Sequence, residues 1–164
     1  MPANLSAGLL MFTVKNGELK IFLVHPGGPF FKNKDKGYWG IPKGLPDENE
    51  ELLNAAKREF EEETGMKPKG DFIPLGTVKQ KNGKVVHAWG FKCEDDSPVD
   101  VNCNTFEMEW PPKSGRKQSF PEIDKGEFFS INEAKEKINE AQKEFIMRLE
   151  KYLLESKLIS LFSL

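Results

Sequence analysis

GLPDENEELLNAAKREFEEETGM, residues 44–66, predicts a loop followed by one amphipathic helix. Asp47 or Asn49 can cap the start of this helix, and Gly65 is expected to end it as a left-handed cap. The apolar side chains recur at helical spacing and form one stripe, made of Leu52, Leu53, Ala56 and Phe60. We therefore expect a helix that packs one face against a core.

The second half of this helix carries four glutamates within five positions. At 100° per residue, Glu59, Glu62 and Glu63 converge within a sector of about 100°, whereas Glu61 points away from it. Like charges at this spacing destabilise a helix by roughly 0.2–0.5 kcal/mol per pair, and the negative end of the helix dipole adds to that cost. A solvated acidic face is one interpretation. Because Glu59 and Glu63 border the apolar stripe, we favour a site for a hard divalent cation, which oxygen ligands suit.

The fixed residues of this stretch resemble the Nudix hydrolase signature. That signature consists of a glycine, a glutamate, an Arg-Glu pair, a Glu-Glu pair and a closing glycine with an aliphatic residue, all at fixed spacing. Every fixed position is matched, by Gly44, Glu50, Arg58, Glu59, Phe60, Glu62, Glu63, Gly65 and Met66. The resemblance implies the Nudix fold, an α/β/α sandwich with a mixed sheet in which the signature forms a loop, a helix and a loop.

Strand signals lie on both sides of the helix. Two hairpins are predicted at Asn-Gly turns, with the strands Ser6–Val14, Leu19–His25, Phe72–Gln80 and Val85–Cys93. Short strands are predicted at Tyr38–Ile41 and Thr105–Trp110, a basic loop at 111–118, and a loop returning to a last strand at 120–129.

A helical segment closes the chain. Ser130 with Glu133 forms a capping box, and a break is expected near Asn139. The apolar stripe of this segment is Ala134, Ile138, Ala141, Phe145, Leu149 and Tyr152. This order of elements predicts a single α+β domain over residues 1–154 and an apolar tail at 155–164.

Composition narrows the functional classes. A chain of 164 residues with 38% hydrophobic residues can form one substantial core. Its net charge of −2 argues against a stable nucleic-acid complex, which needs a basic surface. Cys93 and Cys103 are expected to be reduced thiols. Because no signal-peptide pattern or 18-residue apolar run occurs, we expect a cytoplasmic protein without membrane partners, either a monomer or a homodimer.

The resemblance also implies a reaction, the hydrolysis of a pyrophosphate bond in a nucleoside diphosphate derivative. Mg²⁺, or alternatively Mn²⁺, would neutralise phosphate charge and lower the pKa of the attacking water. Glu59, Glu62 and Glu63 would be the metal ligands, with the backbone carbonyl of Lys43 as a further candidate.

Three residues are predicted to assist the chemistry. Arg58 can orient Glu59 or form an ion pair with Glu50. The general base is either a signature glutamate, with Glu62 as the leading catalytic residue, or Glu122 from a distant loop.

Lys43 directly precedes Gly44, and this Pro-Lys-Gly sequence resembles that of the diadenosine polyphosphate hydrolases and the messenger-RNA decapping enzymes. In those enzymes the lysine meets phosphate, and Gly44 would let the backbone approach the metal closely. The chain lacks the proline and tyrosine marks that follow the signature in ADP-ribose and dinucleoside polyphosphate hydrolases. It instead resembles a bacterial and archaeal group known as NTP pyrophosphohydrolases.

Aromatic and basic side chains could bind the rest of a nucleotide. The candidates for substrate contact are Phe31, Tyr38 and Trp39, and more broadly Phe30, Trp89, Trp110, Lys32, Lys113 and Arg116. His25 and His87 lie on predicted strands and are expected to be structural.

The substrate stays open at this point. A dinucleoside polyphosphate or an NTP is favoured, a house-cleaning pyrophosphatase that releases NMP and pyrophosphate is an alternative, and a non-catalytic nucleotide-sensing module is the alternative of another class.

Overall fold

The computed structural model describes residues 4–96 and 98–156. The predicted tail therefore lies outside the described residues from residue 157 onward. The elements, in chain order, are β1 (Leu5–Lys15), β2 (Glu18–Pro26), β3 (Lys43–Gly44), α1 (Leu52–Thr64), β4 (Ile73–Lys79), β5 (Val85–Lys92), β6 (Thr105–Glu109), β7 (Lys117–Pro121), β8 (Ile123–Ser130), α2 (Ile131–Lys137), the 3₁₀ helix η1 (Glu140–Gln142) and α3 (Lys143–Glu155).

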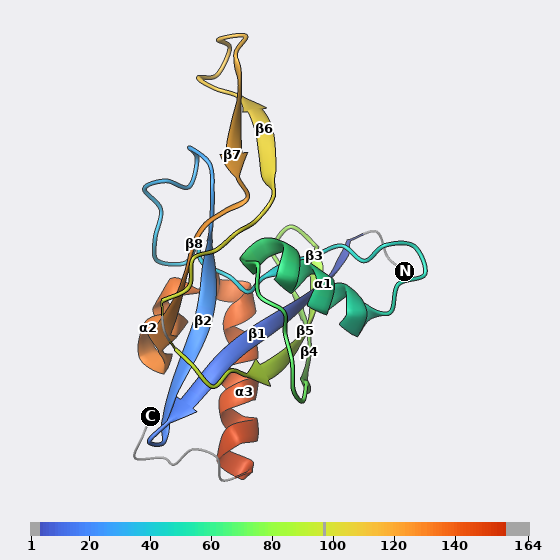
Figure 1. The fold of residues 1–164 in the computed structure, drawn as a ribbon, viewed down its shortest axis with the longest axis vertical. Helices are drawn as coiled ribbons and strands as arrows, with labels where there is room; N and C mark the ends of the chain where they lie inside the picture. The colour runs from blue at the N-terminus through green and yellow to red at the C-terminus, as the bar shows by residue number, and fades with distance from the viewer. Residues whose placement is uncertain (1–3, 97, 157–164) are drawn as a thin grey trace.

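The main sheet is mixed, as predicted. Its strand order is β4-β5-β1-β2-β8, and the short β3 pairs with β1. β1 runs parallel to β5, whereas the other pairings are antiparallel. β6 and β7 form a separate hairpin that projects away from the sandwich (Figure 1).

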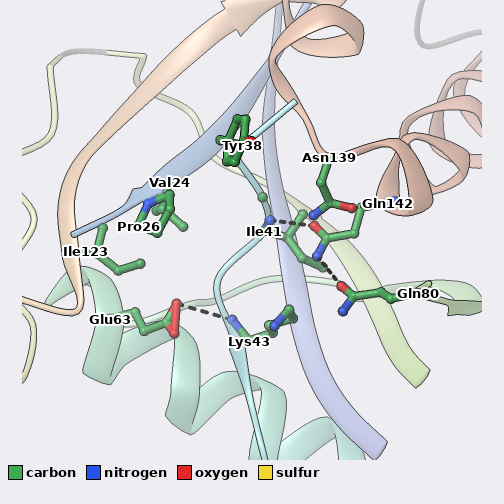
Figure 2. Close-up of a pocket in the computed structure, with 11 residues that line it drawn as sticks. Val24, Pro26, Tyr38, Ile41, Lys43, Glu63, Gln80, Ile123, Asn139 and Gln142 are labelled. Carbon is green, nitrogen blue, oxygen red and sulfur yellow. Dashed lines mark hydrogen bonds between the residues drawn. The ribbon is translucent and has the colours of Figure 1, made fainter. Parts of the chain in front are cut away.

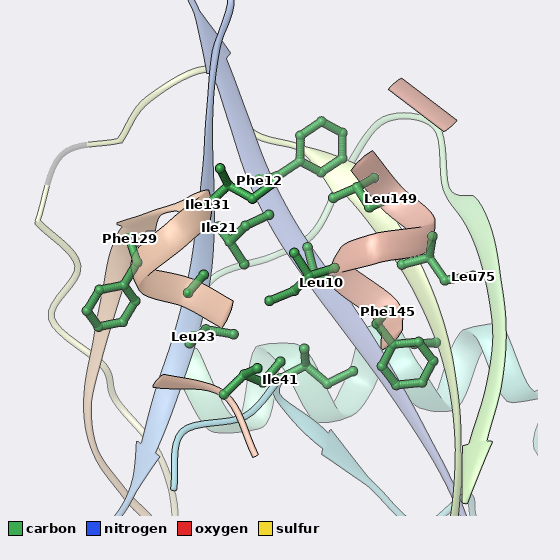
Figure 3. Packing of buried hydrophobic residues seen from close by; sticks show 14 of the residues in the cluster. Leu10, Phe12, Ile21, Leu23, Ile41, Leu75, Phe129, Ile131, Phe145 and Leu149 are labelled. Atoms are coloured by element: carbon green, nitrogen blue, oxygen red, sulfur yellow. The ribbon is translucent and has the colours of Figure 1, made fainter. Parts of the chain in front are cut away.

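Helices cover both faces of this sheet, which gives the predicted α/β/α arrangement (Figure 1). Alternation along β1 and β2 divides the apolar side chains between two cores. Leu10 of β1 packs in the core that α2 and α3 complete, which Figure 3 shows. Leu9 packs in the core that Ala56 and Phe60 of α1 complete. Among the described residues, no helix has both the length and the apolar character needed to cross a membrane.

Local signals placed several turns correctly. Asn16 and Gly17 form the β1–β2 turn with positive φ angles of 53° and 79°. Gly65 ends α1 in the left-handed conformation, and its N–H donates to the carbonyl of Glu61. The Ser130 side chain accepts the N–H of Glu133 at the start of α2. The last helical segment is broken near Asn139, as predicted.

Four expectations were wrong. The helix begins at Leu52 and not after Asp47 or Asn49, because Asn49 adopts a positive φ of 63° and Glu50 accepts the N–H of Asp47, which holds this stretch as a loop. Residues 38–41 form no strand and make isolated bridges at Trp39 and Gly40.

The other two corrections concern the second half of the chain. Residues 117–121, expected within loops, form β7, which pairs along its whole length with β6. Tyr152 is 45% exposed, whereas Leu153 is buried, because the buried stripe of α3 continues from Leu149 at a spacing of four residues and not three.

Candidate active site

Arg58 of α1 contacts three carboxylates of the signature, those of Glu50, Glu59 and Glu62. Its Nε and Nη2 donate to the two carboxylate oxygens of Glu50, each at 2.9 Å. Its Nη1 donates to Glu59 at 3.0 Å and to both oxygens of Glu62 at 3.2 Å, and its Nη2 also donates to the carbonyl of Leu45. Both predicted contacts of Arg58, with Glu59 and with Glu50, are therefore present, and its part in catalysis stays a prediction. Hydrogen bonds from Arg58 lower the pKa of the Glu50 carboxyl.

Glu63 and Lys43 form a second, more buried pair. The Lys43 N–H in β3 donates to the Glu63 carboxylate at 3.3 Å (Figure 2). Burial raises the pKa of Glu63 to about 8, although the hydrogen bond and charge of Lys43 oppose this shift. Burial also lowers the pKa of the Lys43 ammonium. Both groups are therefore held where their charged forms are poorly solvated.

Gly44 allows α1 to approach β3 closely. A Cβ atom at this position would lie 2.1 to 2.4 Å from the carboxylate atoms of Glu59. No other residue type fits without moving that carboxylate. The signature glycine thus places the backbone beside Glu59. The predicted approach of this backbone to a metal stays a prediction.

The expected convergence of Glu59, Glu62 and Glu63 is not present as a finished ligand cluster. Within the described residues, no three acidic, histidine or cysteine side chains are arranged to hold a metal ion. Glu59 and Glu62 turn toward Arg58 and Glu63 turns toward Lys43, because these are the nearest donors.

The electrostatics of the same carboxylates nevertheless suit a cation. Burial raises the pKa of Glu59, and the charges of Glu62 and Glu122 add to the shift. The charges of Glu59 and Glu122 likewise add to the raised pKa of Glu63. A divalent ion with oxygen ligands would relieve this burial and mutual repulsion, so the residues fit Mg²⁺ or Mn²⁺.

A pocket of about 190 Å³ opens beside the Lys43–Glu63 pair (Figure 2). Its lining residues come from strands, loops, α1 and η1: Val24, Pro26, Tyr38, Gly40, Ile41, Lys43, Glu63, Gln80, Ile123, Asn139 and Gln142. The buried carboxylate of the signature helix therefore faces a cavity and not the bulk solvent.

The predicted substrate-contact residues fall into different places. Tyr38 is 44% exposed and lines the pocket, as a stacking residue should. Trp39 was predicted wrongly as a substrate contact, because it is only 2% exposed and its Nε1 donates to Asp35. Phe31 is exposed and lies 6.3 Å from the ring of Tyr38, outside the pocket lining.

The other aromatic and basic candidates lie elsewhere. Trp110 packs against Phe30 at 5.6 Å, and Lys113 and Arg116 are exposed in the β6–β7 connection. None of these residues, nor Lys32 or Trp89, lines the pocket.

Glu122 lies in the short connection between β7 and β8 and is exposed. Its charge adds to the raised pKa values of Glu59 and Glu63. Its role as a general base stays a prediction. His25 is structural, as expected, since its Nδ1 pairs with Asp124 and its Nε2 with the carbonyl of Lys34.

Sequence reasoning missed the amides of the pocket. Gln80, Asn139 and Gln142 come from the end of β4 and from η1, and they meet only in the fold. No motif marks them. The one available signal was the expected helix break near Asn139, which places that residue at a loop.

Comparison with known proteins identifies the family. A NUDIX domain model matches residues 4–149. Nudix hydrolase 7 of Arabidopsis thaliana is 30% identical over 88 residues, which make up 52% of this chain and only 30% of that protein.

Solved structures share the fold over nearly the whole chain. A C. elegans Ap4A hydrolase binary complex has 19% identity and a TM-score of 0.64, with 92% of this chain and 98% of that chain covered. The NUDIX domain of Shewanella oneidensis NrtR, complexed with ADP ribose, has 17% identity and a TM-score of 0.66, with 93% and 90% covered. A mutT/nudix family protein from Listeria innocua has 21% identity and a TM-score of 0.64, with 96% and 98% covered. Because the family model covers most of its length, this chain belongs to the Nudix family.

Proposed function

We propose that the protein is a metal-dependent Nudix hydrolase that cleaves a pyrophosphate bond in a nucleoside diphosphate derivative, with a dinucleoside polyphosphate or an NTP as the leading substrates. The observation that carries this proposal is that Glu63 of the signature and Lys43 line one pocket, while Arg58 holds Glu59 and Glu62 on the same helix. The complete signature supports catalysis over nucleotide sensing, because every acidic position is retained.

Glu59, Glu62 and Glu63 would hold Mg²⁺ or Mn²⁺, and the backbone carbonyl of Lys43 is a further candidate ligand. The ion would neutralise phosphate charge and lower the pKa of a nearby water. This assignment rests on the raised pKa values of Glu59 and Glu63, which a cation would offset.

The protein's own side chains supply position and proton transfer. Arg58 fixes Glu59 and Glu62 through the hydrogen bonds described above. The Lys43 ammonium offers a positive charge to a phosphate in the pocket. Glu122, or alternatively Glu62, accepts a proton from water. The water oxygen forms a bond to one phosphorus while the bridging P–O bond breaks, so each product carries a phosphate end.

The substrate follows from the products of a nucleotide panel assay with Mg²⁺. Cleavage of diadenosine tetraphosphate to ATP and AMP would identify a dinucleoside polyphosphate hydrolase, whereas NMP and pyrophosphate from an NTP would identify the house-cleaning activity. Chromatography separates these products. If no nucleotide is cleaved with Mg²⁺ or Mn²⁺ while calorimetry detects nucleotide binding, the protein is a sensing module and the proposal is wrong.

A further inference from the structure

The pocket beside Glu63 and Lys43 has two chemically different ends. Figure 2 shows Glu63 and Lys43 on one side of the pocket and the amides of Asn139 and Gln142 on the other, and Gln80 is hydrogen-bonded to Gln142. The volume of about 190 Å³ is smaller than the roughly 300–1,000 Å³ of pockets that enclose a whole drug-sized ligand. The pocket therefore suits one part of a nucleotide, with the phosphates directed toward the glutamates.

The orientation of the Gln142 amide is fixed by the backbone. Gln142 is 1% exposed, and its Oε1 accepts the N–H of Ile41 at 2.9 Å. Because a backbone N–H can only donate, this contact identifies the oxygen of the amide and leaves the nitrogen on the other side. The Gln142 Nε2 then donates to Gln80 Oε1 at 3.1 Å.

The same reasoning orients the other two amides. Gln80 uses its oxygen to accept from Gln142, so its nitrogen is the group that is left for a ligand. Asn139 uses its oxygen to accept the backbone N–H of Gln142 at 3.1 Å, so its side-chain nitrogen is also available to a ligand. Among the described residues, neither of these two nitrogens has a protein acceptor. The amide end of the pocket therefore offers the N–H donors of Gln80 and Asn139, whereas each amide oxygen already accepts one hydrogen bond from the protein.

One aliphatic and one aromatic side chain complete this end of the pocket. Ile41 is buried, and the exposed ring of Tyr38 lies in the pocket lining. An aromatic ring beside a row of N–H donors matches a planar base that presents acceptors along one edge. A sugar, by contrast, would present hydroxyl groups and no flat face to Tyr38.

We infer that this pocket binds the nucleobase and selects a 6-oxopurine over a 6-aminopurine through the donors of Gln80 and Asn139. This inference rests on the proposed function, since it assumes a nucleotide whose phosphates face Glu63. A 6-oxopurine presents two acceptors, O6 and N7, on one edge. Adenine keeps the N7 acceptor but presents a donor at N6 in place of O6, so N6 would face an amide N–H and both of these groups would be left unpaired.

The preference differs from the adenine nucleotides named for two structural neighbours. Those neighbours, described as an Ap4A hydrolase and an ADP ribose complex, share 19% and 17% identity with this chain. At that level the likeness shows the fold alone. The base preference is therefore decided by the pocket residues of this chain.

The test compares inosine 5′-diphosphate with adenosine 5′-diphosphate, which differ only in the base. Calorimetry in magnesium-free buffer measures both dissociation constants without turnover. We expect the wild-type protein to bind the inosine nucleotide at least about tenfold more tightly, because an unpaired buried polar group lowers the binding affinity by at least that factor.

Two variants reverse the polarity of the pocket while they keep its internal hydrogen bonds. Gln80→Glu retains an oxygen for Gln142, and Asn139→Asp retains the oxygen that accepts the Gln142 N–H. Each replaces the free donor by an acceptor, so each should remove most of the inosine preference. Asn82→Asp is the matched control, because it adds the same charge nearby, keeps the acceptor for the Lys84 N–H and does not line the pocket. Its binding ratio should equal that of the wild type.

The outcomes separate this inference from the proposed function. Equal binding of both nucleotides, tighter binding of the adenosine nucleotide, or no binding with or without magnesium overturns the inference. Equal weakening of both nucleotides in Gln80→Glu and Asn139→Asp also overturns it, because the pocket would then hold phosphate or ribose. If the inosine preference appears but no nucleotide is hydrolysed, the inference stands and the proposed hydrolase activity fails.

Discussion

The site contains two sets of charged residues, the Arg58 cluster and the Lys43–Glu63 pair. Each set includes a glutamate and a basic residue, but the pKa of the glutamate is shifted in opposite directions. In the Arg58 cluster, hydrogen bonds from the guanidinium lower the pKa of Glu50. In the Lys43–Glu63 pair, burial raises the pKa of Glu63 to about 8. The first arrangement stabilises ionised carboxylates and holds the loop before α1. The second keeps a carboxyl in a place where its charge is unfavourable. Arg58 therefore holds its carboxylates in place, whereas the ionised form of Glu63 is the one that a bound cation would stabilise, which is the proposal made above.

The largest effect is expected from Glu62→Gln, which should lower kcat roughly 10³-fold or more, because a metal ligand contributes several kcal/mol to the transition state. The fold should be retained, since the Glu62 side chain is 42% exposed. Initial rates on the best substrate of the panel, with melting temperatures alongside, measure this. Glu61→Gln removes the same charge from the neighbouring exposed position and should leave kcat unchanged. Full activity of Glu62→Gln would contradict the site assignment.

Gly44→Ala should reduce kcat/KM about 10- to 100-fold, because the new Cβ displaces the Glu59 carboxylate and small misplacements in an active site are costly. Gly44 is not one of the described glycines with a positive φ angle. The loss would therefore come from the contact with Glu59 and not from backbone strain. Steady-state kinetics and a crystal structure of the variant check this. An unchanged kcat/KM would show that the position of Glu59 does not matter.

Glu63→Gln should stabilise the metal-free protein at alkaline pH by about 1–3 kcal/mol. The pKa of Glu63 rises from its ordinary 4.5 to about 8 on folding, so the folded state binds the proton more tightly. Stability is therefore full below pH 4.5 and falls as the pH rises toward 8, and the glutamine variant avoids that loss. Urea unfolding at pH 5 and pH 8.5 measures the free energy of unfolding of both proteins near the two ends of this pH range. A pH-independent difference between the two proteins would refute this explanation.

Glu50→Gln gives the smallest expected change. It should lower the free energy of unfolding by about 1 kcal/mol, because one charge-assisted pair with Arg58 is weakened. Its kcat should stay within about threefold of the wild type, since an amide oxygen can still accept from Arg58. A loss of kcat as large as that of Glu62→Gln would remove the distinction between the two groups.

The sequence predicted the packed face of α1 and the contacts of Arg58 with Glu50 and Glu59, because these depend on spacing within a few turns of chain. The mixed sheet was predicted from the order of the elements and from the resemblance to the Nudix signature. Gly65 and the Asn16–Gly17 turn were also predicted, since their local chemistry specifies a positive φ.

The errors arose where distant contacts decide the structure. Trp39 is an aromatic residue beside the signature loop, but packing against Phe129 and a hydrogen bond to Asp35 place it in the core. The pocket amides were missed for the same reason, because Gln80 and Gln142 are 62 positions apart and meet only through the fold.

Binding of Mn²⁺ to the metal-free protein tests the central claim most directly, with electron paramagnetic resonance as the readout. The account predicts that the wild type and Glu61→Gln bind the ion equally, and that Glu59→Gln, Glu62→Gln and Glu63→Gln each weaken binding at least about tenfold. A wild-type protein that does not bind Mn²⁺, or a Glu61→Gln variant that loses affinity as much as the other three, would contradict it.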